Sequence, residues 1–153
     1  MKDVRQEERI EIYKLHAELA DRVSARREGA NRLYVSLVAG ILIFLAALVR
    51  FGNEQCAMEP ILIGTGMLGA LLCVGWYLVI RSYRQLNSGK FKALHELEQE
   101  LAYPFFKREW ELLAEGKDTK RYWKLTVVET FLPIMLCLGF ICITGITIWS
   151  MTS

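Results

Sequence analysis

Three long stretches of the sequence contain no charged residue, and they limit what the chain can fold into more than any other feature. They cover residues 33–49, 60–80 and 130–153. An α-helix rises about 1.5 Å per residue, so about 20 apolar residues cross the ~30 Å hydrocarbon core of a bilayer. A soluble bundle would have to bury these stretches on every side, and a chain of 153 residues has too little amphipathic helix to surround them. The pattern therefore predicts three transmembrane helices.

The predicted fold class is all-α: a three-span transmembrane helical protein with an N-terminal amphipathic helix and a small helical cytoplasmic insert between spans two and three. Gly29 is expected to end the first helix, and residues 87–89 and Pro104 to interrupt the insert. The expected segments are an amphipathic helix (1–30), a first span (31–50), a short outer loop (51–59), a second span (60–81), the insert (82–127), a third span (128–150) and an outer tail (151–153).

Lysine and arginine are distributed very unevenly between the segments outside the spans. Residues 1–32 carry eight, residues 81–128 carry ten and residues 51–59 carry none. Because cytoplasmic flanks are enriched in basic residues, the N-terminus and the insert are expected in the cytoplasm and the C-terminus outside. Acidic residues nearly balance the bases in both flanks, so we expect no nucleic-acid partner. Anionic lipid headgroups at the cytoplasmic face are an expected partner.

Two arginines follow the second span, in a stretch that begins with Trp76. Arg81 and Arg84 are expected to lie at the level of the lipid headgroups, or to form a charged collar at the cytoplasmic mouth of a ring of subunits. Glu129 is the one acid beside the third span. It is either an intramembrane ligand or the partner of Arg81 or Arg84 in an interfacial ion pair, and we favour the ion pair.

The second span contains several small residues on neighbouring turns. In lipid there is little hydrophobic drive between helices, so close backbone approach at small residues favours helix association. The predicted helix-packing residues are Gly64, Gly66, Gly69 and Ala70.

The insert carries more aromatic side chains than a solvated segment needs. We expect Phe91, Phe105, Phe106 and Trp110 to form a cytoplasmic docking surface, with the N-terminal helix as the nearest partner and neighbouring subunits as the next. The N-terminal helix itself has a narrow apolar stripe made of Ile12, Leu15, Leu19 and Val23. Three arrangements of that helix are consistent with the stripe: it lies on the membrane surface, it packs on the insert, or it pairs with copies of itself in an oligomer.

Neither catalysis nor metal binding is indicated by the sequence. His16 and His95 are isolated, no cysteines have the spacing of a metal site, and no phosphate loop or nucleophile elbow is present. We expect no catalytic, cofactor-binding or metal-ligating residues and no enzyme activity. Cys56, in the outer loop, could pair only with another chain, and its role stays open.

Three stretches of the chain resemble a known family. "CVGWYLVIRSYRQLNSGKFKALHELEQEL", "PFFKREWELL" and "YWKLTVVETFLP" are similar to the RipA-like family of small octameric bacterial inner-membrane proteins. The resemblance implies a ring-like homo-oligomer, an octamer, of three-span subunits in the bacterial inner membrane, with a cytoplasmic domain between spans two and three. It implies no catalytic residue.

Three functional hypotheses fit these features. The first, which the sequence favours, is a homo-oligomeric ring that forms a pore or conduit, and the other two are alternatives to it. The second is a non-conducting membrane scaffold or sensor that recruits a cytoplasmic protein. The third is a membrane-disrupting effector that acts in stress or phage defence.

Overall fold

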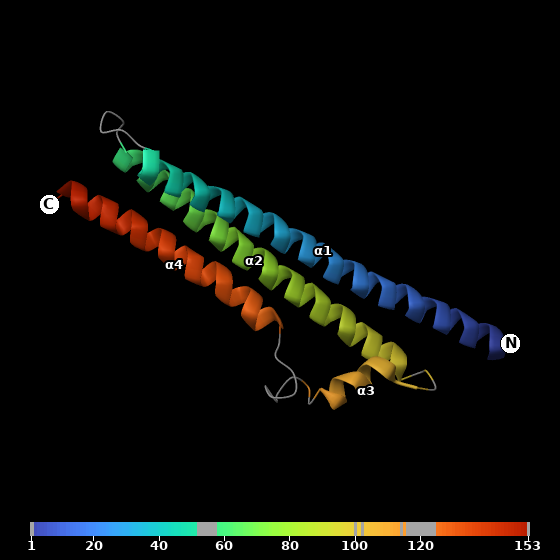
Figure 1. Ribbon diagram of the computed structural model, residues 1–153. Helices are drawn as coiled ribbons and strands as arrows, with labels where there is room; N and C mark the ends of the chain where they lie inside the picture. Colours follow the sequence, from blue (N-terminus) through green and yellow to red (C-terminus); the bar gives the residue numbers. More distant parts are fainter. Residues whose placement is uncertain are drawn as a thin grey trace. The chain divides into compact units, whose positions relative to one another are not determined.

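The computed structural model describes residues 2–51, 58–99, 101, 103–113, 115 and 125–152, and every regular element in that part of the chain is a helix. The helices are α1 (Lys2–Phe51), α2 (Met58–Glu98), α3 (Phe105–Leu112) and α4 (Leu125–Thr152) (Figure 1). The predicted all-α fold class is confirmed. Cys56 and most of the predicted outer loop lie outside the described residues, as do residues 116–124 of the insert and the last residue of the tail.

Three of these helices contain a segment long and apolar enough to cross a membrane. The segments lie within Glu7–Phe51, Met58–Glu98 and Val128–Thr152. Each overlaps one of the three uncharged stretches that the sequence shows. The prediction of three helices long and apolar enough to span a membrane is therefore confirmed.

Two predicted helix ends are wrong, and one is confirmed. Helix α1 continues through Gly29, and α2 continues through residues 87–89 (Figure 1). Glycine inside a helix costs only about 1 kcal/mol relative to alanine, which tertiary contacts of the same helices can offset. One such contact joins the Lys90 ammonium, which donates to the Leu19 carbonyl at 3.1 Å. The interruption at Pro104 is confirmed, because α3 begins at the next residue.

Contacts within the chain divide it into two compact units. The charged unit consists of residues 1–28 and 81–127, and the apolar unit consists of residues 29–80 and 128–153. Helices α1 and α2 each contribute to both units, α3 belongs to the charged unit, and nearly all of α4 belongs to the apolar unit.

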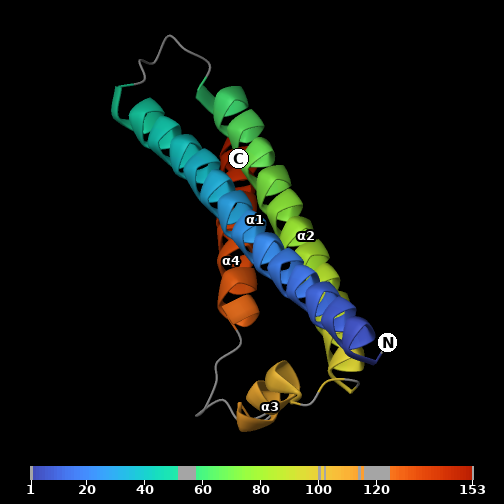
Figure 2. The same ribbon diagram turned by 90° about the vertical axis from the view of Figure 1, so that its right-hand side faces the viewer.

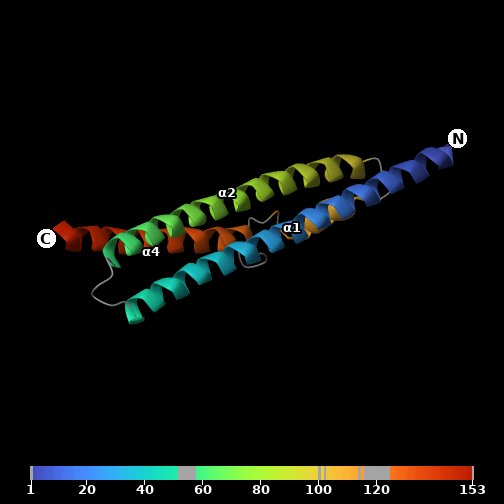
Figure 3. The same cartoon turned by 90° about the horizontal axis from the view of Figure 1, so that it is seen from above.

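The apolar unit has a core built from three helices. Its buried residues are Val38 and Leu45 of α1, Cys73 of α2 and Phe140 of α4. Helix α4 runs beside α2 (Figure 3). At the edge of this unit, the Trp76 indole stacks on the Tyr34 ring at 6.1 Å and donates to the Asn31 amide oxygen at 3.0 Å.

The charged unit is formed by the N-terminal part of α1, the C-terminal part of α2, and α3 beside the end of α2 (Figure 2). Ala20, Val23, Leu94 and Glu98 are buried in it. Of the three alternatives for the N-terminal helix, the structure therefore shows the one in which it packs on the insert. The predicted stripe is only partly right, because Ile12 is 46% exposed and Leu15 is 55% exposed. Contacts from Tyr13 and the Leu19 carbonyl, rather than hydrophobicity alone, set which side of α1 faces inward.

Candidate functional site

A cavity of about 580 Å³ in the charged unit is the candidate site. One face of α2 and one face of α3 form its walls, and one side chain of α1 also lines it. Helix α2 contributes residues spaced three or four apart, which places them on one face, and α3 contributes a matching face. The lining residues are Arg27 of α1, Arg84, Asn87, Ser88, Phe91, Lys92 and His95 of α2, Phe106, Glu109 and Trp110 of α3, and Leu113, which follows α3.

The buried carboxylate of Glu98 holds α3 in position. Its Oε1 accepts from the Phe106 amide at 2.6 Å and from the Tyr13 hydroxyl at 2.9 Å, and its Oε2 accepts from the Lys107 amide at 3.0 Å. Pro104 precedes α3 and makes no side-chain cap, so the first amides of α3 depend on an acceptor from elsewhere. A negative charge at a helix N-terminus also complements the helix dipole. Glu98 therefore joins α1, α2 and α3 through one side chain.

The same contact changes the acidity of Tyr13. Burial, followed by the hydrogen bond to Glu98 and the negative charge of that carboxylate, raises the pKa of the Tyr13 phenol to about 12. The Tyr13 ring also lies 6.1 Å from the Phe106 ring. At neutral pH the phenol therefore stays a hydrogen-bond donor.

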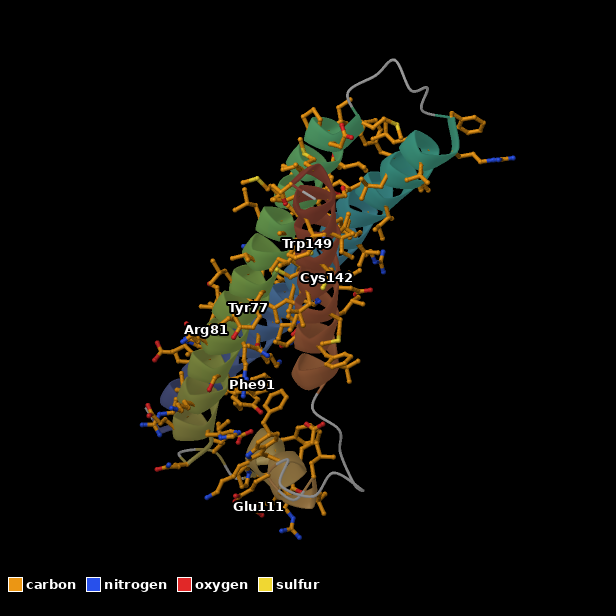
Figure 4. The ribbon with its side chains drawn as sticks, turned by 90° about the vertical axis from the view of Figure 1, so that its left-hand side faces the viewer. Tyr77, Arg81, Phe91, Glu111, Cys142 and Trp149 are labelled. Carbon is orange, nitrogen blue, oxygen red and sulfur yellow. The ribbon has the colours of Figure 1, made fainter. Side chains whose placement is uncertain are left out.

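Three of the four residues of the predicted docking surface form one aromatic cluster. The Phe106 ring lies 5.7 Å from the Phe91 ring and 5.7 Å from the Phe105 ring, edge to face in both cases. Phe91 lies on the side of α2 near α3 (Figure 4). Trp110 follows Phe106 by one turn and is 39% exposed at the cavity wall. Part of this aromatic set is thus used inside the charged unit, and Trp110 and Phe105 remain exposed.

Arg81 and Arg84 are both exposed on α2 in the charged unit. They line a second hollow of about 390 Å³ together with Gln85, Ser88, Gly89 and Lys92. Arg81 extends away from the helix axis (Figure 4). Arg84 also lines the larger cavity, which the sequence did not indicate.

The small residues of the second span do not share one environment. A Cβ added at Gly69 would lie 2.6 Å from the Phe140 ring, and one at Gly66 would meet the Thr144 hydroxyl. The Ala70 carbonyl accepts a weak hydrogen bond from the Cys137 thiol at 3.8 Å. A Cβ added at Gly64 would have no neighbour within 4 Å. Helix α4 therefore approaches α2 closely at three of the four positions.

Glu129 lies at the beginning of α4 in the apolar unit, whereas Arg81 and Arg84 belong to the charged unit. The ion pair between them stays a prediction. Among the residues that the structure describes, no group of three or more histidine, cysteine or acidic side chains could hold a metal ion.

Sequence reasoning missed Glu98 and Tyr13, the two side chains that fix α3. One signal for Glu98 was available, because a helix that begins directly after Pro104 has no serine, threonine, asparagine or aspartate to cap it. An acid from another helix is the natural substitute. Tyr13 had no comparable signal, since its partner lies 85 residues away.

Comparison with known proteins places the chain in a family. No curated protein and no solved structure matches the sequence. The model of one family matches residues 10–149, which include the lining of the cavity and nearly all of the three helical segments that are long and apolar enough to cross a membrane. That extent is nearly the whole chain, so the protein belongs to the octameric membrane protein family (8xMP).

Proposed function

We propose that the protein is a non-conducting scaffold and sensor: a homo-octameric, three-span protein of the bacterial inner membrane that binds a cytoplasmic signal through its charged unit. In this proposal the N-terminus and the charged unit lie in the cytoplasm and the C-terminus lies outside. The uneven distribution of lysine and arginine supports that orientation. The role is one of binding, not of catalysis.

The observation that carries the proposal is a contrast between the two units. In the apolar unit, the hydroxyls of Thr65, Thr144 and Thr147 donate to carbonyls of their own helices at 2.7 to 2.9 Å. Each of these hydroxyls gives its proton to its own helix and has no donor left for a permeating anion, although its oxygen can still accept a hydrogen bond. In the charged unit, cations and aromatic rings line a cavity. Polar groups ready for recognition are therefore concentrated outside the membrane.

A conduit is the second candidate, and one observation favours it. Arg81 and Arg84 are exposed on the same stretch of α2, and an octamer repeats them in every subunit. Such a ring of arginines would attract anions at a pore mouth. The exposed side chains of the described spans are nevertheless mostly apolar, which supports the scaffold over the conduit.

Ion flux through vesicles that contain the purified octamer tests the proposal. The scaffold predicts no flux above that of empty vesicles. Flux whose anion selectivity is lost when both Arg81 and Arg84 are changed to glutamine would refute the scaffold in favour of the conduit. Growth arrest with loss of membrane potential on overexpression would instead favour the membrane-disrupting effector.

A further inference from the structure

The cavity of the charged unit has the composition of a site for a small anion that also has a flat ring. Its volume of about 580 Å³ falls in the range of about 300–1,000 Å³ that is typical of small-molecule sites. A cavity of this size holds a single small molecule and not a folded partner. The charge of the cavity lining, its aromatic surface and its unpaired hydrogen-bonding groups each indicate what kind of ligand would fit.

Positive charge exceeds negative charge around the cavity. Arg27, Arg84 and Lys92 line it against a single carboxylate, that of Glu109. Arg84 and Lys92 are exposed and make no ion pair with the residues that the structure describes. Arginine and lysine bind phosphate through charge-assisted hydrogen bonds, and arginine can do so with two bonds at once. The cavity therefore favours an anion, and a phosphate group fits best.

Aromatic side chains line the cavity from both α2 and α3. Phe106 is held edge-on to Phe91 and Phe105, so its position is fixed by the cluster. Trp110, one turn further along α3, keeps part of its indole exposed at the cavity. A nucleobase stacked on such a ring is stabilised by the contact, whichever base it is. The headgroup of a phospholipid has no flat ring that could stack on these aromatic side chains.

Two polar atoms beside the cavity have no partner. Asn87 Oδ1 and His95 Nε2 are buried and accept or donate no hydrogen bond among the described residues. A buried polar atom without a partner destabilises the fold, so a ligand that supplies the missing hydrogen bond is favoured. Both side chains line the cavity, and a rotation of either would present this atom to a ligand with amino groups and ring nitrogens. The edge of a nucleobase carries such groups.

We infer that the cavity binds a nucleoside phosphate, with the phosphate on Arg84 and Lys92 and the base against Trp110. The inference rests on the proposed function, since it supplies the ligand that the sensor recognises. The ring and the phosphate must be present in one molecule for full affinity, because the cations and the aromatic rings of the cavity recognise different parts of it.

Calorimetric titration of the full-length octamer in nanodiscs of zwitterionic lipid tests the inference. The probes are the diphosphates of adenosine, guanosine, cytidine and uridine, the parent nucleosides, and inorganic phosphate. At least one diphosphate should saturate one site per chain. Its parent nucleoside and inorganic phosphate should each bind at least about tenfold more weakly, a loss of about 1.4 kcal/mol.

Matched variants identify the site. Lys92→Gln and Trp110→Ala should each weaken diphosphate binding about tenfold or more. Lys14→Gln removes a lysine from an exposed position of α1, and Leu112→Ala removes an apolar side chain from an exposed position of α3. Neither residue lines the cavity, so both variants should bind like the wild type. All four changes are at exposed residues, and the octamer is checked by native mass spectrometry before each titration.

Several outcomes would overturn the inference. One is that no diphosphate binds with a Kd below about 1 mM. Another is that Lys92→Gln and Trp110→Ala leave the affinity unchanged. A third is that no nucleotide binds, whereas phosphatidylglycerol vesicles bind and their binding requires Lys92 but not Trp110. The cations would then be lipid-binding residues. Ion flux through sealed vesicles that contain the same purified octamer separates the two proposals, because flux contradicts the scaffold whether or not a nucleotide binds.

Discussion

Replacing Glu98 by glutamine should release α3 from the charged unit. The Glu98 side chain is 1% exposed and its carboxylate accepts three hydrogen bonds, two from amides of α3 and one from Tyr13. Glutamine has a similar shape but one acceptor oxygen. If that oxygen keeps the two donors at Oε1, the new amide group faces the Lys107 amide, donor against donor.

The size of the effect follows from these contacts. A hydrogen bond to a charged group contributes about 1.5–3 kcal/mol, and a charge at a helix N-terminus adds about 0.3–1 kcal/mol. Losing one bond and the charge should therefore cost about 2–4 kcal/mol of local stability. Because each 1.4 kcal/mol is a factor of ten, amide hydrogens of α3 should exchange about 30 to 700 times faster.

Hydrogen exchange followed by mass spectrometry on the full-length octamer measures this effect. Tyr13→Phe removes one of the three bonds and keeps the charge, so its effect on α3 should be smaller. Glu96→Gln is the matched control, because Glu96 is an exposed acid two residues away on the same helix. Unchanged protection of α3 in Glu98→Gln, or an equal loss in Glu96→Gln, would refute the assigned role.

Three further predictions concern other contacts. The Tyr13 phenol should ionise near pH 12 rather than 10, which the difference in tyrosinate absorbance between the wild type and Tyr13→Phe measures. The stability that this phenol gives to the charged unit should therefore be constant below pH 10 and be lost as the pH rises from 10 to 12. Gly69→Ala should cost about 1–3 kcal/mol in a thermal melt, because the new methyl group meets the buried Phe140 ring, while Gly64→Ala should not destabilise; equal losses would contradict this. Leu15→Asn, at an exposed apolar position of α1, should favour dissociation of the octamer in native mass spectrometry, and an unchanged octamer would show that this residue is not at a subunit contact.

The membrane-spanning helices could be predicted because absence of charge is a local property of the sequence. The interruption at Pro104 was predictable for the same reason, since proline acts on its own backbone. The continuity of α1 at Gly29 and of α2 at residues 87–89 was not. Glycine and asparagine only weaken a helix, and whether it continues depends on contacts such as that between Lys90 and the Leu19 carbonyl.

The candidate site was less accessible to sequence reasoning than the fold. Phe91, Phe106 and Trp110 stood out by their type, and Arg84 by its place after a span. Their convergence on one cavity depends on where α3 docks. Docking in turn depends on Glu98, which sits in a run of alternating acids that looks like a solvated helix face. A long-range contact of this kind leaves little trace in local spacing.

The two hollows of the charged unit share three residues, and this overlap relates the expected lipid contact to the inferred ligand. Arg84, Ser88 and Lys92 line both the cavity of about 580 Å³ and the hollow of about 390 Å³ beside it. One guanidinium cannot give its full set of hydrogen bonds to a lipid phosphate and a nucleotide phosphate at the same time. The two anions should therefore compete, and by linkage each should lower the affinity for the other by the same factor. Nucleotide affinity should fall as phosphatidylglycerol replaces zwitterionic lipid in the nanodisc. Arg81 lines only the smaller hollow, so Arg81→Gln should weaken this effect of the lipid. The same variant should bind nucleotide like the wild type in zwitterionic lipid. A sensor built in this way would respond to its ligand and to the charge of the surrounding membrane through the same two cations.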